Sequence, residues 1–390
     1  MSYPYVSPAV GLCQVEGGYL AYDVSTKFLH ELNPVAALIV ELADGTRSLE
    51  EISALIAPLV PGNDPAATVG AFVAEGLASG LLVSGDDGAS HPARFLTADE
   101  VRDAGSECWE LDRSEAALKL AQRWVELKPE DSLAWYALGD RAQWLERIPL
   151  AVEAYKRYLD FDPGNDAVRQ ILAGLEGGPP PPRCSDHCIE LIFEAFASSY
   201  DEQMRGALRY EAPERIEEML AAYLDGRADL EVLDLGCGTG LMGALLRRRA
   251  RRLTGVDLSA AMSEQARALS VYDAIELAEI HAWLESPGAC FDLIVSTDCL
   301  VYVGDLARVT RLAFARLKPG GWFAYSVEKG EHYPLQLKPT GRYTHHRNHL
   351  VETAAAAGLN LIDLKEGFLR SEGGKEVVGW IALLRKPDSG

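Results

Sequence analysis

The sequence predicts an α/β protein in three parts: a small α+β domain, an all-α segment and a C-terminal domain with a parallel sheet. Three observations lead to this fold class. Near the N-terminus, short strand-like segments precede three helices with marked starts. In the middle of the chain, a helical pattern recurs after 34 residues. In the last part, the apolar strand of "EVLDLGCGTG" enters a glycine-rich turn that a helix follows, as in a Rossmann-like fold.

The bulk composition is that of a folded, acidic protein. Hydrophobic residues make up 48% and charged residues 24% of the 390 positions, which is ordinary for globular domains. The net charge of −21 argues against nucleic-acid binding, because phosphate contacts need lysine and arginine. The start, "MSYPYVSPAVGLC", lacks the pattern of a signal peptide, and apolar runs such as "VAALIV" are too short to span a bilayer. We therefore expect a cytoplasmic protein with no membrane partner.

The seven cysteines lack the spacing of a disulfide framework, so we expect them to be reduced. Cys184 and Cys188 form the one tight pair, in "CSDHC", with His187 between them. No second Cys/His pair follows at the spacing of a metal site. We therefore interpret them as linker cysteines.

Residues 1–90 contain the elements of the α+β domain. "GLCQVEGGYLAYDV" and "TKFLHEL" are typical of three short strands, with a Gly17–Gly18 turn between the first two. Three helices follow, and "LLV" is typical of a last short strand. The helix starts are marked by Asn33 before Pro34, by the capping box of Ser48 and Glu51, and by Asp64 before Pro65. This order predicts a winged-helix-like domain.

"LNPVAALIVELADGTRSLEEI" and "VGAFVAEGLASGLLV" in this region resemble PqqD-like domains, which are the type of the RiPP recognition elements. The resemblance covers nearly all of residues 1–90 and implies that a leader peptide binds as an added strand. It would pair beside residues 27–32 and lie against the helix at about 66–79. The side chains in position to contact the peptide are Phe28, His30, Val69 and Phe72.

Two other interpretations of this domain stay open. Each of these apolar residues, taken singly, is more simply part of the small core. A DNA-binding winged helix is disfavoured by charge: residues 1–95 hold three basic and eleven acidic side chains, so 3 − 11 = −8. Such a surface attracts a peptide that carries lysine or arginine.

Residues 97–176 form the all-α segment. "AWYALGDRAQWLERIPLAVEAYKRYLDFDPGN" resembles a tetratricopeptide repeat, and Pro129 precedes Pro163 by one period, 163 − 129 = 34. The resemblance implies two helical hairpins, for which we expect a spacer or docking role. The proline run of "GGPPPPRCSD" then predicts an extended linker.

Residues 187–390 carry a series of motifs in a fixed order. Asp257 ends the strand after the glycine-rich turn, 257 − 234 = 23 residues beyond Asp234. "CFDLIVSTDCLVYVGDL", "RLKPGGWFAYSVE" and the closing strands follow. Together they resemble the class I S-adenosylmethionine-dependent methyltransferases. "IFEAFASSYDEQMRGALRYEAPERI" and "GRYTHH" narrow this to bacterial methyltransferases with tetratricopeptide repeats, in which the segment of Tyr200 and Tyr210 closes over the cofactor.

The resemblance implies S-adenosylmethionine as cofactor and assigns residues to it. Glycines allow the backbone to approach the ligand, and an acid accepts the ribose hydroxyls. Glu279 stands where the wider class has Asp, so this sequence departs from the pattern at the adenine. The assigned residues are Gly236, Gly238 and Gly240 for close backbone approach, Asp234 beside the methionine portion, Asp257 at the ribose, Glu279 and Ile280 at the adenine, and Leu258 as a further cofactor-binding residue.

Methyl transfer needs alignment, and a base where the acceptor atom is protonated. Asp298, at the end of a strand, is expected near the transferred methyl, with a helix cap as its equally weighted alternative. The further catalytic candidates are Tyr302, Arg342 and His345, with Glu328 and Tyr343 as other possible bases or anchors. "HHRNH" could suggest a metal bound by His345, His346 and His349, but we expect no metal.

A leader-binding module joined to a methyltransferase predicts an enzyme that modifies a ribosomally made precursor peptide. Arg342 favours a carboxylate acceptor through a paired hydrogen-bond fork. The second hypothesis is a small-molecule O- or N-methyltransferase whose N-terminal domains are structural or form a homodimer. The third is an adaptor with a silent fold, against which the intact glycine turn and the two acids argue.

Overall fold

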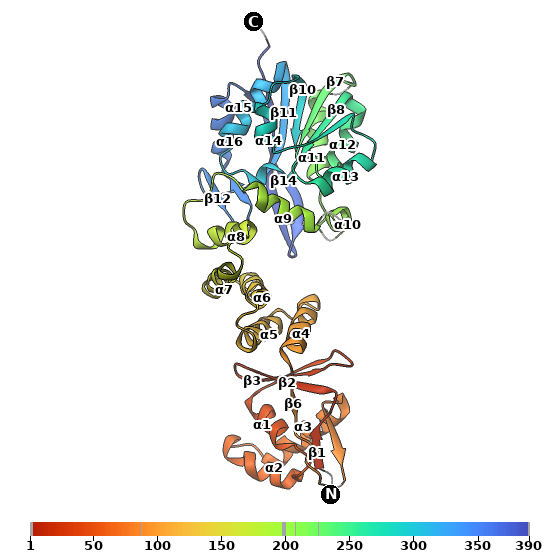
Figure 1. Ribbon diagram of the computed structural model, residues 1–390, viewed down its shortest axis with the longest axis vertical. Helices are drawn as coiled ribbons and strands as arrows, with labels where there is room; N and C mark the ends of the chain where they lie inside the picture. The colour runs from red at the N-terminus through yellow and green to blue at the C-terminus, as the bar shows by residue number, and fades with distance from the viewer. Residues whose placement is uncertain (1–2, 87, 197–199, 207, 225, 389–390) are drawn as a thin grey trace. The chain divides into compact units, whose positions relative to one another are not determined.

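The computed structural model describes residues 3–86, 88–196, 200–206, 208–224 and 226–388. The chain forms two compact units, Met1–Pro163 and Gly164–Gly390, whose elements are labelled in Figure 1. None of the helices formed by the described residues combines the length and the apolar character that a membrane crossing needs.

The first unit begins with a mixed α+β region. β2 (Val10–Val15), β3 (Gly18–Asp23) and β4 (Leu29–Leu32) lie in one sheet, ordered β4-β3-β2-β6, with β6 (Arg94–Phe95) beside β2. α1 (Pro34–Leu42), α2 (Leu49–Ile56) and α3 (Pro65–Ser79) follow, and β5 (Leu82–Gly85) pairs with β1 (Tyr3–Val6). The predicted three strands, three helices and last strand are present, while β1 and β6 were not predicted.

Capping groups set the starts of the three helices as the sequence predicts. Asn33 accepts from the N–H of Ala36, Ser48 and Glu51 form a reciprocal capping box, and Asp64 accepts from the N–H of Ala66. Inside, the strands and helices share one apolar core. Val69 belongs to this core and is fully buried. Its predicted contact with a peptide is therefore wrong, because a peptide cannot reach it.

Two helical hairpins complete the first unit. α4 (Ala98–Glu110) pairs with α5 (Ser114–Leu127), and α6 (Ser132–Trp144) pairs with α7 (Ile148–Phe161). Both hairpins turn through a left-handed residue, Asp112 and Glu146, which are 146 − 112 = 34 positions apart. Gly139 leaves room for the ring of Tyr155 from the facing helix, which a Cβ would strike. The turn geometry therefore recurs with the period of the sequence pattern.

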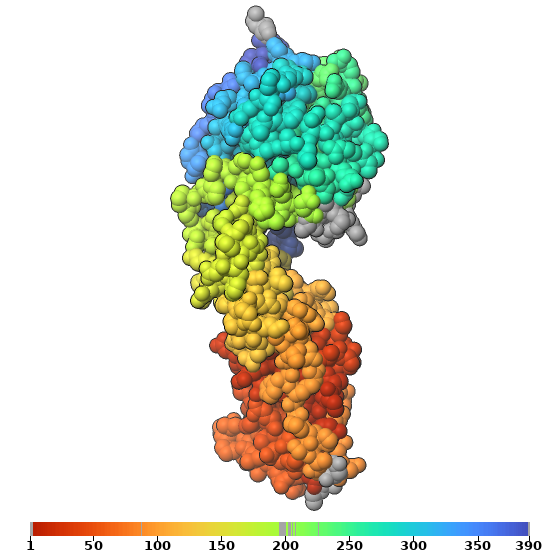
Figure 2. Space-filling view, in the orientation of Figure 1, coloured from red at the N-terminus to blue at the C-terminus, as the bar shows by residue number. Residues whose placement is uncertain are grey.

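The second unit starts with helices that precede the sheet. They are α8 (Asp166–Glu176), α9 (Asp186–Phe196), α10 (Tyr200–Arg205) and α11 (Ala212–Leu224). α8 contacts α9 and β12 (Leu335–Leu337), and Gln170 of α8 donates to the carbonyl of Gly341. In Figure 2, α8 and α9 lie in yellow-green against the teal and blue surface of the sheet region.

The nine-stranded sheet of this unit follows the order β9-β8-β7-β10-β11-β15-β14, with β13 and β12 beyond the end of β11. β7 to β11 run parallel and β15 is antiparallel to β11. The strands are β7 (Leu230–Leu235), β8 (Ala250–Asp257), β9 (Ala274–Leu277), β10 (Phe291–Ser296), β11 (Leu317–Lys329), β13 (Tyr343–His345), β14 (Asn360–Glu372) and β15 (Lys375–Arg385). β8 and β10 flank β7 on opposite sides, so the strand order reverses there. This is where open α/β sheets bind ligands.

Helices cover both faces of the sheet, as Figure 1 shows. α11 and α12 (Leu241–Leu246) pack over one apolar cluster. α14 (Ile280–Glu285), α15 (Ala307–Arg316) and α16 (Arg347–Ala356) pack over the other. α13 (Ala260–Ala268) lies beside α9. The result is a three-layer, Rossmann-like α/β fold.

Cys184 and Cys188 form a disulfide at the start of α9. Both residues are buried. This differs from our expectation of reduced cysteines, which rested on the absence of a framework spacing. The bridge joins a residue just before α9 to one in its first turn, a local pairing that framework spacings do not report.

Candidate active site

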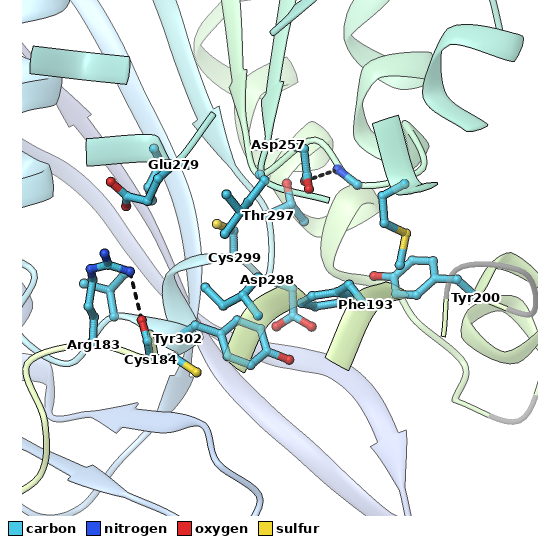
Figure 3. A pocket seen from close by; sticks show the side chains of 17 residues that line it. Arg183, Cys184, Phe193, Tyr200, Asp257, Glu279, Thr297, Asp298, Cys299 and Tyr302 are labelled. Atoms are coloured by element: carbon cyan, nitrogen blue, oxygen red, sulfur yellow. Dashed lines mark hydrogen bonds between the residues drawn. The ribbon is translucent and has the colours of Figure 1, made fainter. Parts of the chain in front are cut away.

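A cavity of about 720 Å³, mouth included, opens at the carboxyl ends of β7, β8 and β10. Figure 3 shows Asp257 entering it from the end of β8, Thr297 to Tyr302 from the segment after β10, and Phe193 from α9. A smaller hollow adjoins it and shares Tyr200, Gly236, Gly238 and Thr297 with it. Nine of the predicted site residues line the main cavity: Tyr200, Gly236, Gly238, Asp257, Leu258, Glu279, Ile280, Asp298 and Tyr302.

The glycine-rich turn after β7 brings bare backbone to the cavity. Gly236 has φ 70°, and a Cβ there would collide with the side chain of Cys299. Gly238 has φ 53° and faces open space. Left-handed backbone favours glycine. These two glycines therefore form a side-chain-free wall that a ligand can approach closely.

Asp257 is held at this wall by backbone donors. Its Oδ2 accepts from the N–H of Gly238 at 2.8 Å and its Oδ1 from the N–H of Ser259 at 2.9 Å. Burial raises the pKa of the carboxyl, and the backbone hydrogen bonds oppose that shift. Each oxygen keeps a lone pair, so Asp257 can accept further hydrogen bonds from a hydroxylated ligand.

Glu279 lies at the N-terminus of α14 and lines the cavity. Burial opposes its ionisation, but hydrogen bonds from His281 at 2.6 Å and from the N–H of Ala282 at 2.9 Å prevail and lower the pKa of Glu279 to about 2. The residue is therefore an anionic acceptor that is fixed in place.

Asp298 forms an ion pair with an arginine that the sequence did not predict. Nη1 of Arg370 donates to both carboxylate oxygens, at 2.9 and 2.7 Å. Arg370 also bonds Glu328, and Arg342 bonds Glu328 and Glu372. Because the carboxylate accepts from Arg370, and no helix N–H of the described residues donates to it, the helix-cap alternative for Asp298 is wrong.

Aromatic side chains form the opposite wall. Phe193 of α9 meets the ring of Tyr302 edge-on, with centroids 5.6 Å apart, and lies 6.4 Å from the ring of Tyr200. Burial raises the pKa of Tyr200, Tyr210 and Tyr302. All three hydroxyls therefore stay protonated at neutral pH.

Two predicted cofactor residues lie elsewhere. Asp234 is buried, and its Oδ2 accepts from the hydroxyl of Tyr272 at 2.7 Å. Neither hollow described above includes it in its lining. Gly240 starts α12 at φ 95°, where a Cβ would strike Leu269. Both residues support the glycine-rich turn through buried contacts, and neither lines the cavity.

Two predicted catalytic residues, Arg342 and His345, are bonded to other parts of the fold and do not line the cavity. The guanidinium of Arg342 is committed to Glu328, at 2.7 Å, and to Glu372, so no fork is left for a substrate carboxylate. His345 is fully buried, and its Nε2 lies 2.9 Å from the carbonyl of Val303 and 3.0 Å from that of Gly304. Carbonyls only accept, so Nε2 carries the proton. Burial lowers the pKa of His345 to about 4, and the residue holds the segment that carries Tyr302.

The remaining polar candidates of this region are structural too. The hydroxyl of Tyr343 donates to the carbonyl of Pro181 at 2.6 Å. His346 caps α16 by accepting from the N–H of Asn348, and His349 accepts from the N–H of Leu306. These bonds fix the linker and the segment after β10 to the sheet.

Sequence reasoning missed three features of the cavity. Thr297 faces both hollows, and its buried hydroxyl has no partner among the described residues. Ile189 and Phe193 of α9 supply apolar walls. Arg370 lies 72 positions from Asp298. The strand-end position of "STDC" was the one available signal, and it pointed to Asp298 alone.

In the first unit, β4 is an edge strand that pairs with β3 alone among the described strands. The N–H of Asp23 donates to the carbonyl of Phe28, and bonded pairs alternate along an antiparallel ladder. The main-chain groups of His30 therefore face β3, and those of Leu29 and Glu31 face outward. Arg113 occupies one of them by donating to the carbonyl of Leu29 at 3.3 Å.

The side chains predicted to contact a peptide are partly brought together at this edge. Phe28 is 50% exposed, and its ring lies 4.7 Å from that of His30, edge-on. Burial lowers the pKa of His30, while the nearby charge of Glu75 on α3 opposes this shift. Phe72 is partly buried against the core.

Known proteins resemble the second unit. A family model described as a methyltransferase domain matches residues 200–364. Ubiquinone biosynthesis O-methyltransferase of Paracidovorax citrulli is 30% identical over 162 residues, which are 36% of this chain and 67% of that protein. The protein of the same name from Serratia proteamaculans is 28% identical over 179 residues, 41% of this chain and 73% of that protein.

Among solved structures, Burkholderia thailandensis 1,6-didemethyltoxoflavin-N1-methyltransferase with bound 1,6-didemethyltoxoflavin and S-adenosylhomocysteine is similar. The match covers 54% of this chain and 94% of the Burkholderia chain, with a TM-score of 0.42 and 23% identity.

Proposed function

The chain belongs to the class I S-adenosylmethionine-dependent methyltransferases, and from this premise we propose that it O-methylates a precursor peptide whose leader its N-terminal region holds. In this proposal, residues 1–90 are a PqqD-like domain, residues 97–176 are tetratricopeptide repeats, and residues 187–390 are the methyltransferase domain. The observation that carries the methyl-transfer part is the cavity at the point where the strand order reverses, lined by Asp257, Glu279 and Asp298.

The residues present fit S-adenosylmethionine, which supplies an electrophilic methyl group on a sulfonium. Asp257 offers two acceptor oxygens for a diol beside the bare backbone of Gly236 and Gly238. Glu279 offers an anionic acceptor for an exocyclic amine next to the apolar Ile280. The hydroxyl of Thr297, for which the described residues offer no partner, and the carboxylate of Asp298 complete a polar side that suits a cation.

The charges at the cavity favour a neutral acceptor over an anionic one. The arginine that lines it, Arg183, already donates to Asp186 at 2.6 Å and to the carbonyl of Cys184 at 2.9 Å. Arg342 and Arg370 are bound by carboxylates. The support from Arg342 for a carboxylate acceptor is therefore lost, and we propose a hydroxyl in its place. The relatives named O-methyltransferases agree with an oxygen acceptor.

The chain has its own groups for alignment and for the proton that a hydroxyl must lose. The rings of Phe193 and Tyr302 and the side chain of Ile189 exclude water from one side of the cavity. Asp298, whose oxygens keep lone pairs beside the bonds from Arg370, accepts the proton at Oδ1 or Oδ2.

The proposal of a peptide substrate is supported by the edge of β4. Leu29 and Glu31 present outward main-chain groups, and Phe28 and His30 form a partly exposed surface beside them. An extended peptide satisfies such groups by pairing as a further strand. Residues 1–95 hold three basic and eleven acidic side chains, so an acidic first region favours a basic leader. Holding the leader raises the local concentration of the core peptide.

The direct test uses peptides encoded by short reading frames beside the gene, made synthetically. The full chain is incubated with each peptide and with S-adenosylmethionine that carries a tritiated methyl group. Radioactivity should appear in one peptide, and a leader fragment without the core should inhibit the transfer. Transfer that ignores excess leader fragment would instead favour the second candidate, a small-molecule methyltransferase, which the names of the relatives support.

A further inference from the structure

Asp298 is held in a costly backbone conformation. Its φ is 53°, in the left-handed region that non-glycine residues rarely adopt. Two contacts hold the residue there. Its N–H donates to Oγ of Ser326 at 2.9 Å, and its carboxylate receives both bonds from Arg370. The side chain is 11% exposed, and what remains open faces the cavity.

Arg370 itself has little freedom to move. Its side chain is 4% exposed. The residues on either side of it in β14 are bonded to the segment before α11: the carbonyl of Leu369 accepts from the N–H of Glu211 at 2.8 Å, and the N–H of Ser371 donates to the carbonyl of Leu208 at 2.5 Å. The guanidinium therefore stays against Asp298.

The positive and negative charges of this cluster, Asp298 included, nearly cancel. Three carboxylates and two guanidinium groups give 2 − 3 = −1. Burial raises the pKa of Asp298, and Arg370 opposes this shift. Removing the arginine would leave buried carboxylates with one cation among them, which favours uptake of a proton. Charged and titratable groups from several elements face Asp298. They are Arg370 and Glu372 of β14, Glu328 of β11, Arg342 before β13, Tyr302 after β10, Tyr200 at the start of α10 and Tyr210 after α10.

We propose that Arg370 is a positioning residue that keeps Asp298 ionised on the cavity wall, and that this charge makes the cavity prefer S-adenosylmethionine over S-adenosylhomocysteine. The two ligands differ by the methyl group that makes the sulfur cationic, so a fixed anion distinguishes substrate from product. The inference rests on the methyl-transfer function proposed for this cavity. It does not depend on the acceptor.

The test measures the affinities of both ligands by calorimetry on the full chain, between about pH 6 and about pH 9. Each variant is compared with the wild type at the same pH, so titration of the ligands themselves cancels. In Arg370→Met, the preference for S-adenosylmethionine relative to wild type should fall by at least about threefold as the pH decreases across this range, because Asp298 takes up a proton. Arg370→Lys should restore most of the wild-type preference.

Arg249→Met is the matched control. Arg249 has the same 4% exposure and bonds the buried Glu217, far from the lining of the cavity. It should leave the ratio of the two affinities at the wild-type value at every pH. Asp298→Asn should lose the preference for S-adenosylmethionine equally at every pH. If Arg370→Met does not fold, this variant tests the role of the charge.

A folded Arg370→Met variant whose ratio follows the wild type at all pH values would overturn the inference, and so would an unchanged preference in Asp298→Asn. If the wild type binds neither ligand, the proposed function of the cavity fails first. The two failures are therefore distinguishable.

Discussion

The N–H of Gly238 donates to Oδ2 of Asp257 at 2.8 Å, so the glycine-rich turn after β7 and the end of β8 form one surface. Among the described residues, backbone groups position the carboxylate, since its other oxygen accepts from the N–H of Ser259. Main-chain donors fix an acceptor more rigidly than mobile side chains do. The cofactor site is thus largely preformed.

This relationship predicts the effect of Asp257→Ala. The variant should weaken binding of S-adenosylhomocysteine at least about tenfold, because a bound diol loses a charged acceptor worth roughly 1.5–3 kcal/mol. Isothermal titration calorimetry measures this. The exposed Glu276→Ala on neighbouring β9 is the control and should bind as the wild type does. Equal affinity in Asp257→Ala and wild type would remove the cofactor from this cavity.

The alternation of bonds along β4 predicts where a proline blocks a peptide. Glu31→Pro removes an outward N–H and should be tolerated by the fold, because edge strands accept proline on their open side. It should weaken binding of a labelled basic peptide, selected on the wild-type chain from a display library, by about tenfold, as expected for one or two net hydrogen bonds.

Glu31→Gln is the control for this experiment, because it keeps the N–H and removes the charge that pairs with Lys119. Phe72→Glu should weaken the peptide as Glu31→Pro does, by placing a charge on the apolar side of α3. Fluorescence anisotropy reports the affinity, and circular dichroism reports the fold. If both folded variants keep wild-type affinity, the peptide does not lie along β4.

The buried imidazole of His345 predicts a pH dependence of stability. Burial lowers its pKa to about 4, below the ordinary value near 6.5, so the unfolded state binds the extra proton between these values. Stability of the second unit should therefore fall as the pH decreases from about 6.5 to about 4, by up to roughly 3 kcal/mol from this residue.

His345→Gln should flatten part of that pH dependence, since an amide can donate to the same carbonyls of Val303 and Gly304 without titrating. His349, whose pKa burial also lowers, contributes to the remainder. Differential scanning calorimetry measures the unfolding of the second unit, which is the transition whose temperature S-adenosylhomocysteine raises. An identical pH slope in wild type and His345→Gln would contradict this assignment.

The disulfide predicts a modest gain in stability. Cys184 and Cys188 are four positions apart, and closing so short a loop contributes on the order of 2 kcal/mol. Reduction should lower the transition temperature of the same calorimetric peak, and Cys188→Ser should reproduce the loss without any reductant. Maleimide that labels both residues in untreated, denatured protein would show that the bridge is absent.

Local signals in the sequence predicted the helices and most of the strands. Strands that depend on contacts between distant residues were not predicted. Asn33, Ser48 and Asp64 fix helix starts through bonds to residues two or three positions away, so the sequence displays both partners. β1 and β6 are short and pair with segments far along the chain, which no periodicity reveals.

The same contrast governs the site. Asp257 was predictable because it ends the strand after the glycine-rich turn, and Glu279 because the family resemblance assigns its position to the adenine. Arg370 was not, because its partner Asp298 lies 72 positions away in the segment after β10 and no pattern links them. Arg342 was predicted as a catalytic residue, but its commitment to Glu328 and Glu372 depends on pairing that only the fold displays.

The most direct test of the central claim is mass spectrometry of a flanking-gene peptide after incubation with the full chain and S-adenosylmethionine. The account predicts that the peptide gains the mass of one methylene, that fragmentation locates it on a side-chain oxygen outside the leader, and that Glu31→Pro loses this product while its affinity for S-adenosylhomocysteine stays at the wild-type value. A methylated peptide formed equally by Glu31→Pro, or no methylated peptide from a wild-type chain that binds the cofactor, would contradict it.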